Sequence, residues 1–326
     1  MQAYIIRRVL LIIPTMFVVS LIVFFAIRLI PGDVVSQMAS GIGNMPKMTQ
    51  EKVRKRLGLD APIPVQYGRW LGVIRDQHGS FTGLFQGGLG LSLWTSVPVT
   101  RIVLKRLPLT FELALFSLTI AILIAIPIGI YSAIRQNTMG DYTARSFSMF
   151  AIAMPDFWLG TLVIVFPSLW WGWSPPIEYT SFTKDPLKNL GQFIVPSLVL
   201  GMLMSGLVMR MTRTMMLEII RQDYIRTGWS KGLKEKVVIL RHALPNALIP
   251  VITVIGYMLP WVIGGTIIIE RIFGLPGLGH LLVQSINERD YPVISGITIF
   301  VAIIVMLANL VIDLTYALLD PRIRYR

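Results

Sequence analysis

The stretch PLTFELALFSLTIAILIAIPIGIYSAI occupies residues 108–134 and carries a single charged residue, Glu112. An α-helix needs roughly 20 mainly apolar residues to cross the ~30 Å hydrocarbon core of a bilayer, and this stretch is longer than that minimum. It therefore predicts a transmembrane helix, and stretches of the same kind recur before and after it.

Five further apolar stretches are predicted to cross the membrane. The composition agrees, because 54% of the 326 residues are hydrophobic and only 14% are charged, which is outside the usual range of soluble domains. The first stretch follows Arg7 and Arg8 but is about twice as long as the apolar part of a signal peptide, so we interpret it as an uncleaved helix. The sequence thus predicts an all-α, polytopic membrane protein with six transmembrane helices. The five further spans are Val9–Ile30, Phe147–Trp171, Phe193–Met209, Asn246–Ile269 and Ser295–Leu319.

Lysine and arginine in the short loops set the predicted orientation. Eight basic residues lie between the fourth and fifth spans and three end the chain, whereas the loops 172–192 and 270–294 together carry four basic residues against five acids. Because basic loops stay on the cytoplasmic side, both termini are predicted to be cytoplasmic. We attribute the net charge of +13 to this topology and expect a lipid bilayer, not nucleic acid, as the partner.

The segment 31–107 is too long for a tight turn and is predicted to be an external subdomain. It holds ten basic residues against four acids, but loops longer than about 60 residues cross the membrane largely regardless of charge. Within it, Thr49–Leu57 has a capping hydroxyl before a helix-forming run and Gly58 as a stop, which predicts a short helix. We therefore expect three parts: an N-terminal transmembrane helix at 1–30, this subdomain at 31–107, and a five-helix core at 108–326 with a cytoplasmic loop at 210–245.

The sequence lacks the usual signatures of enzyme chemistry. There is no cysteine, which excludes disulfides, thiolate metal sites and cysteine nucleophiles. The three histidines have no metal-ligand spacing, and the nucleotide-binding pattern G-x-x-x-x-G-K-[ST] does not occur. We expect no metal site, no catalytic residue and no cofactor on this chain, so any ATP must be bound by another chain.

Three acidic residues, Glu112, Asp156 and Asp313, lie inside or at the edges of predicted spans. A carboxylate in the membrane is costly and is by default a candidate cation relay or substrate contact, so Glu112 and Asp156 are candidates for a translocation path. The alternative is structural pairing. Glu112 is close to the outer interface, Asp156 follows a proline that frees backbone donors, and Asp313 is close to the cytoplasmic end.

The fifth span concentrates residues that disturb helices, namely Pro250, Gly256, Pro260, Gly264 and Gly265. Broken backbone is tolerated at membrane depth only where protein or a water-filled cavity surrounds it, so this span is predicted to be interior and near a translocation path. The alternative is that its glycines let neighbouring helices approach closely. The two interpretations are compatible.

The loop before the fifth span carries the most informative pattern. Arg226-Thr227-Gly228 is followed by Gly232, and Leu244-Pro245 comes after a further interval. A glycine in the middle of this basic, partly apolar segment predicts a break into two short helices. One of them could lie across the membrane surface and present a face to a soluble partner.

At these residues the chain resembles the membrane subunits of ABC importers, whose shared cytoplasmic signature is E-A-A, three residues, Gly, nine residues, then I-x-L-P. Gly232, Leu244 and Pro245 match at the required spacing. Arg226-Thr227-Gly228 departs from E-A-A, although the peptide-uptake branch commonly has R-T-A there, and His242 replaces the isoleucine.

The rest of the chain resembles the first (B-type) permease of the dipeptide, oligopeptide and nickel branch from end to end. The resemblance rests on an ordered run of short motifs, each weak alone. They are Arg28-Leu-Ile-Pro-Gly-Asp33, Gly58-Leu-Asp-Ala-Pro62, Val65-Gln-Tyr67, Arg106-Leu-Pro108, Pro155-Asp-Phe-Trp-Leu-Gly160, Glu270-Arg-Ile-Phe-Gly274, Pro276-Gly-Leu-Gly279, Arg289-Asp-Tyr-Pro292 and Asp320-Pro-Arg-Ile-Arg-Tyr325.

This resemblance implies the type I importer permease fold in a bacterial or archaeal cytoplasmic membrane. It implies a related second permease, two cytoplasmic ATPase subunits that carry ATP and Mg²⁺, and an external solute-binding protein. The substrates implied are peptides, oligosaccharides, nickel chelates or opines. The residues expected to couple the permease to an ATPase are Arg226, Thr227, Gly228, Trp229, Ser230, Lys231, Gly232, Leu244 and Pro245.

Two other functions compete with this one. In a secondary transporter driven by an ion gradient, the three intramembrane acids would couple the ion, but we find no convincing inverted repeat of halves. A membrane-bound enzyme would need a nucleophile with a base, or a metal constellation, and the sequence offers neither.

Overall fold

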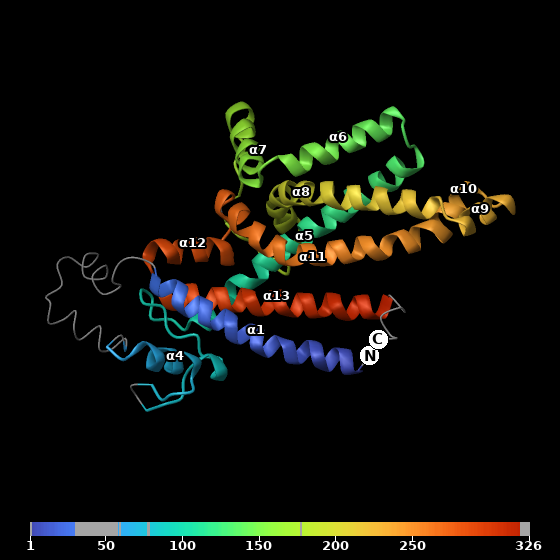
Figure 1. Cartoon of the computed structure of the whole chain (residues 1–326). Coiled ribbons are helices and arrows are strands. Elements are labelled where there is room, and N and C mark those ends of the chain that lie inside the picture. The colour runs from blue at the N-terminus through green and yellow to red at the C-terminus, as the bar shows by residue number, and fades with distance from the viewer. Residues whose placement is uncertain (1, 30–57, 59, 77–78, 177, 320–326) are drawn as a thin grey trace. The chain divides into compact units, whose positions relative to one another are not determined.

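A computed structural model describes residues 2–29, 58, 60–76, 79–176 and 178–319 (Figure 1). Within this part of the chain the structure is helical, and its one β contact is an isolated antiparallel bridge between Leu91 and Pro98. The elements are α1 (Gln2–Leu29), α4 (Ile63–Leu71), the 3-10 helix η1 (Leu84–Gln86), α5 (Val99–Ile134), α6 (Met139–Ala153), α7 (Asp156–Trp171), α8 (Pro186–Ile220), α9 (Asp223–Ser230), α10 (Glu235–Val237), the π-helix η2 (Val238–Ala243), α11 (Leu244–Ile272), α12 (Leu278–Glu288) and α13 (Tyr291–Leu319).

Five of the six predicted spans are single helices. By length and apolar composition, α1, α5, α8, the continuous stretch Glu235–Ile272 and α13 could each cross a membrane, and the bent pair α6–α7 adds a sixth crossing if it counts as one. This confirms an all-α protein with up to six membrane-spanning segments. The helix α8 extends well beyond the predicted Phe193–Met209 at both ends, because helix formation continues where the apolar character stops.

The predicted third span, Phe147–Trp171, is wrong as a continuous helix. It is split between α6 and α7, whose axes differ by 99°. The break is at Pro155, which has no N–H to donate and whose ring disfavours helical backbone in the residue before it. Met154 accordingly is extended, with φ −80° and ψ 130°. Because the residues on both sides of the break are apolar, composition alone predicted one continuous span.

Two further differences concern the loops. The helix α12 lies in the segment 270–294, for which the sequence predicted only a loop. The helix predicted at Thr49–Leu57 lies outside the described residues. Gly58, predicted to stop it, has φ +69°, a left-handed conformation that glycine adopts without steric cost.

Contacts divide the chain into two units, and the first combines Pro108–His280 with the two ends of the chain. In it, α8 packs against α6, α7 and α11. Small residues allow the backbones to approach closely. A Cβ on Gly201 would come within 2.7 Å of the Ser117 carbonyl oxygen of α5, and one on Gly206 within 2.9 Å of the Ser148 carbonyl oxygen of α6. The three-part division predicted at 1–30, 31–107 and 108–326 follows membrane topology, not packing, and stays a prediction.

The second unit consists of Val9–Leu107 and Leu281–Ile304. Its short bridge region is fixed by the buried carboxylate of Asp290, which accepts hydrogen bonds from the Ser92 hydroxyl at 2.6 Å and the Leu93 amide at 3.2 Å. On α1, the ring of Phe24 contacts the rings of Tyr67 and Trp70 of α4. The segment after residue 58 is therefore anchored to both α1 and the α12–α13 junction.

Candidate functional site

The connector between α8 and α11, residues 221–243, contains α9, a turn, α10 and η2. Figure 1 shows α9 and α10 at the end of α8 and α11 that is farthest from α7. The break predicted at Gly232 is present, since α9 ends at Ser230 and α10 begins at Glu235. The second part is not a separate short helix as predicted, because α10 and η2 continue into α11.

Gly232 is required by the geometry of this turn. Its φ is +75°, its N–H donates to the Trp229 carbonyl at 2.9 Å, and the Leu233 N–H donates to the Gly228 carbonyl at 3.3 Å. These two bonds form a Schellman motif, in which the residue after the helix takes the left-handed conformation and the last carbonyls are satisfied. A Cβ on Gly232 would meet nothing within 4 Å, so the glycine is needed for its conformation and not for space.

Leu244-Pro245 marks the return into a long helix. Proline in a helix removes one hydrogen bond and its ring clashes with the carbonyl four residues earlier, here that of Arg241. Directly before Pro245 the backbone widens into the π-helix η2, where the Leu244 N–H donates to the Ile239 carbonyl, five residues back. Such widened turns accommodate irregularities without ending the helix. Pro245 thus fixes where the connector becomes α11.

The inner face of α9 is anchored in an apolar cluster. Ile225 is fully buried there together with Val238 and Ile239 of η2 and Met216 of α8. The amide of Asn246 adds a polar tie, donating to the Tyr224 hydroxyl at 3.0 Å. The short helix therefore has a defined position on the ends of α8 and α11.

The outer face of the connector combines apolar and basic side chains. Trp229 is 41% exposed and Leu233 40% exposed, on either side of the Gly232 turn. Arg226, Thr227, Ser230 and Lys231 are exposed on the same connector, and the Arg226 guanidinium forms a 3.5 Å ion pair with its neighbour Asp223. Large exposed apolar side chains rimmed by charges are typical of a surface that another protein covers. The structure therefore brings the predicted residues 226–232 together on one exposed helix and turn.

The residues of α11 predicted to line a path are in three different environments. A Cβ on Gly256 would come within 2.9 Å of Ile312 of α13, and one on Gly265 within 3.1 Å of Leu200 of α8, so both allow close helix packing. A Cβ on Gly264 would meet nothing within 4 Å, and Pro260 is half-buried inside a helix that continues through it. No pathway is identified by these positions.

Each of the three intramembrane acids has its own structural partner. The Glu112 carboxylate accepts a hydrogen bond from the Tyr179 hydroxyl at 3.3 Å, and burial, followed by the charge of Glu112, raises the pKa of Tyr179. Asp156 accepts the Phe157 N–H at the first turn of α7. Asp313 forms an ion pair with Arg8 of α1. Among the described residues, no group of three or more histidines or acids is placed to hold a metal ion.

Two further buried carboxylates, besides Asp290, had no role assigned to them from the sequence. Glu270 is fully buried at the end of α11 and accepts hydrogen bonds from the Thr110 hydroxyl at 2.6 Å and the Gly279 amide at 2.7 Å. Asp141 is fully buried at the start of α6 and pairs with Arg213 of α8. Both residues flank predicted spans, where a carboxylate is normally read as a solvated loop residue, so the sequence held no local signal for either.

Comparisons with known proteins agree on one family. Residues 125–325 match the family model of the binding-protein-dependent transport system inner membrane component, and residues 1–114 match the N-terminal model of the same membrane component. A predicted peptide transport system permease protein of Brucella abortus is 40% identical over 325 residues, covering all of both chains. The oligopeptide transport system permease protein AppB of Bacillus subtilis is 39% identical and the dipeptide transport system permease protein DppB of Escherichia coli 35% identical, again over the full length of both chains.

Solved structures agree on the fold. The chain is similar to an amino acid ABC transporter (TM-score 0.54, 15% identity) and to the MetNI methionine ABC transporter in inward-facing conformations (TM-score 0.54, 18% identity). Each similarity covers 67% of this chain and at least 94% of the other. Together with the fold and the exposed connector, these matches show that this multi-pass membrane protein belongs to the binding-protein-dependent transport system inner membrane components, as a permease subunit of the peptide branch of ABC importers.

Proposed function

We propose that this permease forms half of the translocation pathway of a peptide importer in a bacterial or archaeal cytoplasmic membrane. A related second permease supplies the other half, two ATPase subunits bind ATP and Mg²⁺ on the cytoplasmic side, and an external binding protein delivers the solute. This chain is then not itself an enzyme, because hydrolysis takes place on its partners. The peptide-transport names of the full-length relatives support the substrate class.

The outer face of the connector is the observation that carries the proposal. Trp229 and Leu233 are exposed beside Arg226 and Lys231, on α9 and the turn that follows it, and α9 is held in place by the buried cluster around Ile225. The positive-inside distribution predicts this segment to be cytoplasmic. We propose that the segment Arg226–Lys236 docks into a groove of the ATPase subunit as the coupling helix, with Leu244-Pro245 setting the point where it joins α11.

Transport follows by alternating access. ATP-driven closure of the ATPase pair draws the two coupling helices together, the attached membrane helices rotate, and the pathway opens to the outside to receive solute. In this cycle Gly256, Gly264 and Gly265, with Pro260, belong to a helix that turns against its neighbours. Glu112, inside α5, and Asp156, at the start of α7, remain proposed contacts of the path.

The test is purification followed by transport in proteoliposomes. The chain is expressed with its candidate partners, and two ATPase subunits are expected to copurify in a complex that takes up labelled peptide only with ATP and the binding protein. Arg226→Glu is expected to leave the permease inserted in the membrane while hydrolysis no longer drives uptake. Uptake by this chain alone in a proton gradient would instead support the secondary transporter.

The substrate is tested separately on the binding protein. Peptide, oligosaccharide and nickel-chelate libraries are offered to it, and peptides are expected to bind and to compete with uptake. Binding of sugars alone would refute the peptide assignment while leaving the importer assignment intact.

A further inference from the structure

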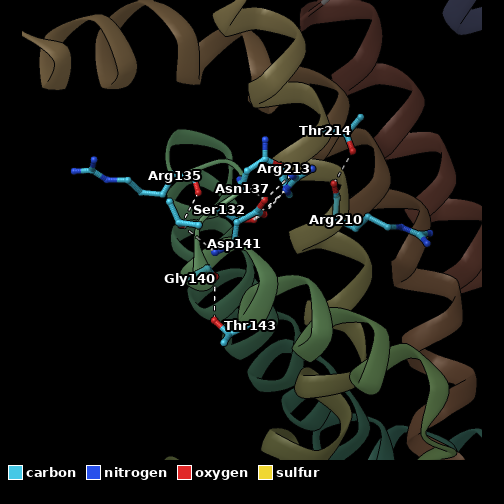
Figure 2. A network of polar contacts seen from close by, with 10 residues as sticks. Ser132, Arg135, Asn137, Gly140, Asp141, Thr143, Arg210, Arg213 and Thr214 are labelled. Carbon is cyan, nitrogen blue, oxygen red and sulfur yellow. Dashed lines mark hydrogen bonds and ion pairs between the residues drawn. The ribbon is translucent and has the colours of Figure 1, made fainter.

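A buried ion pair joins α6 to α8 at the end of α8 that leads into the connector. The Asp141 carboxylate is 0% exposed. Arg213 donates two hydrogen bonds to this carboxylate, from Nε to Oδ1 at 2.8 Å and from a terminal nitrogen to Oδ2 at 2.9 Å (Figure 2). Such a bidentate arrangement fixes the orientation of both side chains more strictly than a single charged hydrogen bond does.

Two further donors converge on the same carboxylate. The Ser132 hydroxyl, in the last turn of α5, donates to Oδ1 at 2.5 Å. The Asn137 N–H, in the loop between α5 and α6, donates to Oδ2 at 3.1 Å. Arg213 also donates to the Ser132 oxygen at 3.0 Å. One acidic side chain therefore holds the ends of α5, α6 and α8 in a single arrangement.

The pair is selective among the basic residues nearby. Figure 2 shows the side chains of Arg135 and Arg210 directed away from Asp141, and both are exposed. Only Arg213 among the three points inward. A buried ion pair adds little net stability compared with an apolar pair of the same size, and its best-attested use is to specify one register between elements.

The ion pair lies close to the connector. Arg213 lies two turns before α8 ends at Ile220, and the chain then turns into α9. Ala133 is adjacent to Ser132 and belongs to the cluster that buries Ile225 of α9, as does Met216, which is one turn beyond Arg213. The ion pair and the anchor of α9 thus share the same ends of α5 and α8.

We propose that Asp141 and Arg213 are positioning residues of energy coupling. Their ion pair makes the ends of α5, α6 and α8 one rigid body, so that a displacement of α9 is passed to the membrane-spanning parts of these helices. Without the pair, α8 moves against α6 and the displacement is lost where they meet. This inference rests on the proposed function of the connector as the contact to the ATPase.

The first test compares a single variant, which removes one charge of the pair, with a double variant, which removes both, in the complete importer. In Arg213→Gln the buried carboxylate loses its counter-charge, and the amount of assembled importer is expected to fall. In the double variant Asp141→Asn with Arg213→Met, no charge is buried, the Asn oxygen can still accept the Asn137 N–H, and its amide nitrogen can donate to the Ser132 hydroxyl, so assembly is expected to return to the wild-type level. Arg210→Gln, one turn away and exposed, is the matched control and is expected to behave as wild type.

The readout is peptide taken up per ATP hydrolysed in proteoliposomes, at equal amounts of assembled importer. A pair that merely stabilised the fold would leave this ratio unchanged once assembly is restored. For a positioning role, the ratio in the double variant is expected to fall about tenfold, within the usual range of coupling between distant sites. A ratio within about twofold of wild type would overturn the inference.

A second test replaces the ion pair by a covalent bridge. Because the chain has no cysteine, Asp141→Cys with Arg213→Cys can be joined selectively by a thiol-bridging reagent in an importer with cysteine-free partners. The reduced form is expected to hydrolyse ATP with little uptake, and bridging is expected to raise uptake per ATP at least about fivefold. Bridging that forms without any gain contradicts a rigid body that moves as one.

The two hypotheses fail in different ways. If no ATPase copurifies with the wild-type chain, the proposed function of the connector is wrong. If ATPase copurifies and Arg226→Glu uncouples it while the double variant stays coupled, the connector assignment stands and only the role of the ion pair is refuted.

Discussion

The continuous helical stretch Glu235–Ile272 has a glycine-bearing turn near each end, and the two turns use glycine for opposite reasons. At Gly232, before η2 and α11, a Cβ would meet nothing within 4 Å, and the glycine is needed for its φ of +75°. At Gly277, between α11 and α12, a Cβ would stand 2.3 Å from the carboxyl carbon of Glu270. The first glycine provides a conformation and the second provides space.

The side chains beside the two turns also differ, in how exposed they are. Trp229 and Leu233 beside the first turn are exposed, whereas Phe273 and Leu275 beside the second are 4% exposed each. The second turn closes around Glu270, whose carboxylate accepts from Thr110 and from the first amides of α12. A turn completed by its own chain serves internal structure, whereas the exposed apolar neighbours of the first turn are consistent with the partner contact proposed for it.

The largest effect is expected from Glu270→Ala. The substitution leaves the Thr110 hydroxyl and the amides of Gly279 and His280 without their buried acceptor, and each lost acceptor costs about 1–3 kcal/mol. A loss of at least about 3 kcal/mol in unfolding free energy is expected. Thermal unfolding of the purified importer measures it as a lower melting temperature.

Glu288→Ala is the matched control for Glu270. Glu288 is exposed, and its carboxylate accepts a hydrogen bond from the Gln284 amide within its own helix, at 2.9 Å. Its loss is expected to change stability by less than about 0.5 kcal/mol. Equal melting temperatures for the two variants would contradict an internal role for the second turn.

The next effect is expected from Gly277→Ala. The φ of Gly277 is not in the left-handed region, so alanine can adopt its backbone conformation. The cost is steric, because the added methyl group must displace the Glu270 carboxylate from its donors. We expect a loss of about 2 kcal/mol in unfolding free energy. In the Glu270→Ala background the methyl group has room, and the additional cost is expected to vanish. A cost that persists there would place the strain in the backbone.

The sequence was sufficient to predict the first turn but not the second. Gly232 can be recognised in the sequence because a helix-breaking residue interrupts a run with helical spacing. Its neighbours need no distant contact to form the turn. Glu270 binds Thr110, which is 160 residues away, and Asp141 binds Arg213, 72 residues away. Such pairs depend on tertiary packing, which a single sequence does not encode locally.

The third span shows the converse limit. Its apolar composition correctly predicts segments that belong in a membrane, and Pro155 marked a local disturbance. Composition cannot tell a kinked helix from two helices at 99°, because that choice depends on what α8 and α11 present to α7. The same holds for Glu112, Asp156 and Asp313, whose separate partners only the fold reveals.

Trp229→Ala tests whether the first turn serves a partner. Exposed aromatic side chains that enter a partner's pocket commonly contribute 2 kcal/mol or more to binding, so the affinity for the isolated ATPase subunit is expected to fall about 30-fold. The melting temperature of the permease is expected to stay the same, since the ring is not packed inside. Binding is measured by titrating the purified permease with the ATPase subunit.

Trp171→Ala provides the control, because Trp171 is 75% exposed and ends α7, and Figure 1 shows α7 far from α9 and α10. It is expected to leave the affinity for the ATPase subunit unchanged. Unchanged affinity in Trp229→Ala as well would remove the difference between the two turns.

The smallest effect is expected at Gly232 itself and separates conformation from space. Alanine must adopt φ near +75° there, which costs about 1–2 kcal/mol of strain although no atom is in its way. Asparagine tolerates the left-handed conformation better, so Gly232→Asn is expected to be milder than Gly232→Ala, although its side chain is larger. Gly228→Ala, inside α9 with only ordinary contacts at 3.7 Å and beyond, is expected to be neutral or slightly stabilising. Uptake per ATP hydrolysed and melting temperature are therefore expected to be lowest for Gly232→Ala, higher for Gly232→Asn and close to wild type for Gly228→Ala. If Gly232→Asn were instead worse than Gly232→Ala, side-chain size would decide the outcome, and the first turn would be as tightly enclosed as the second.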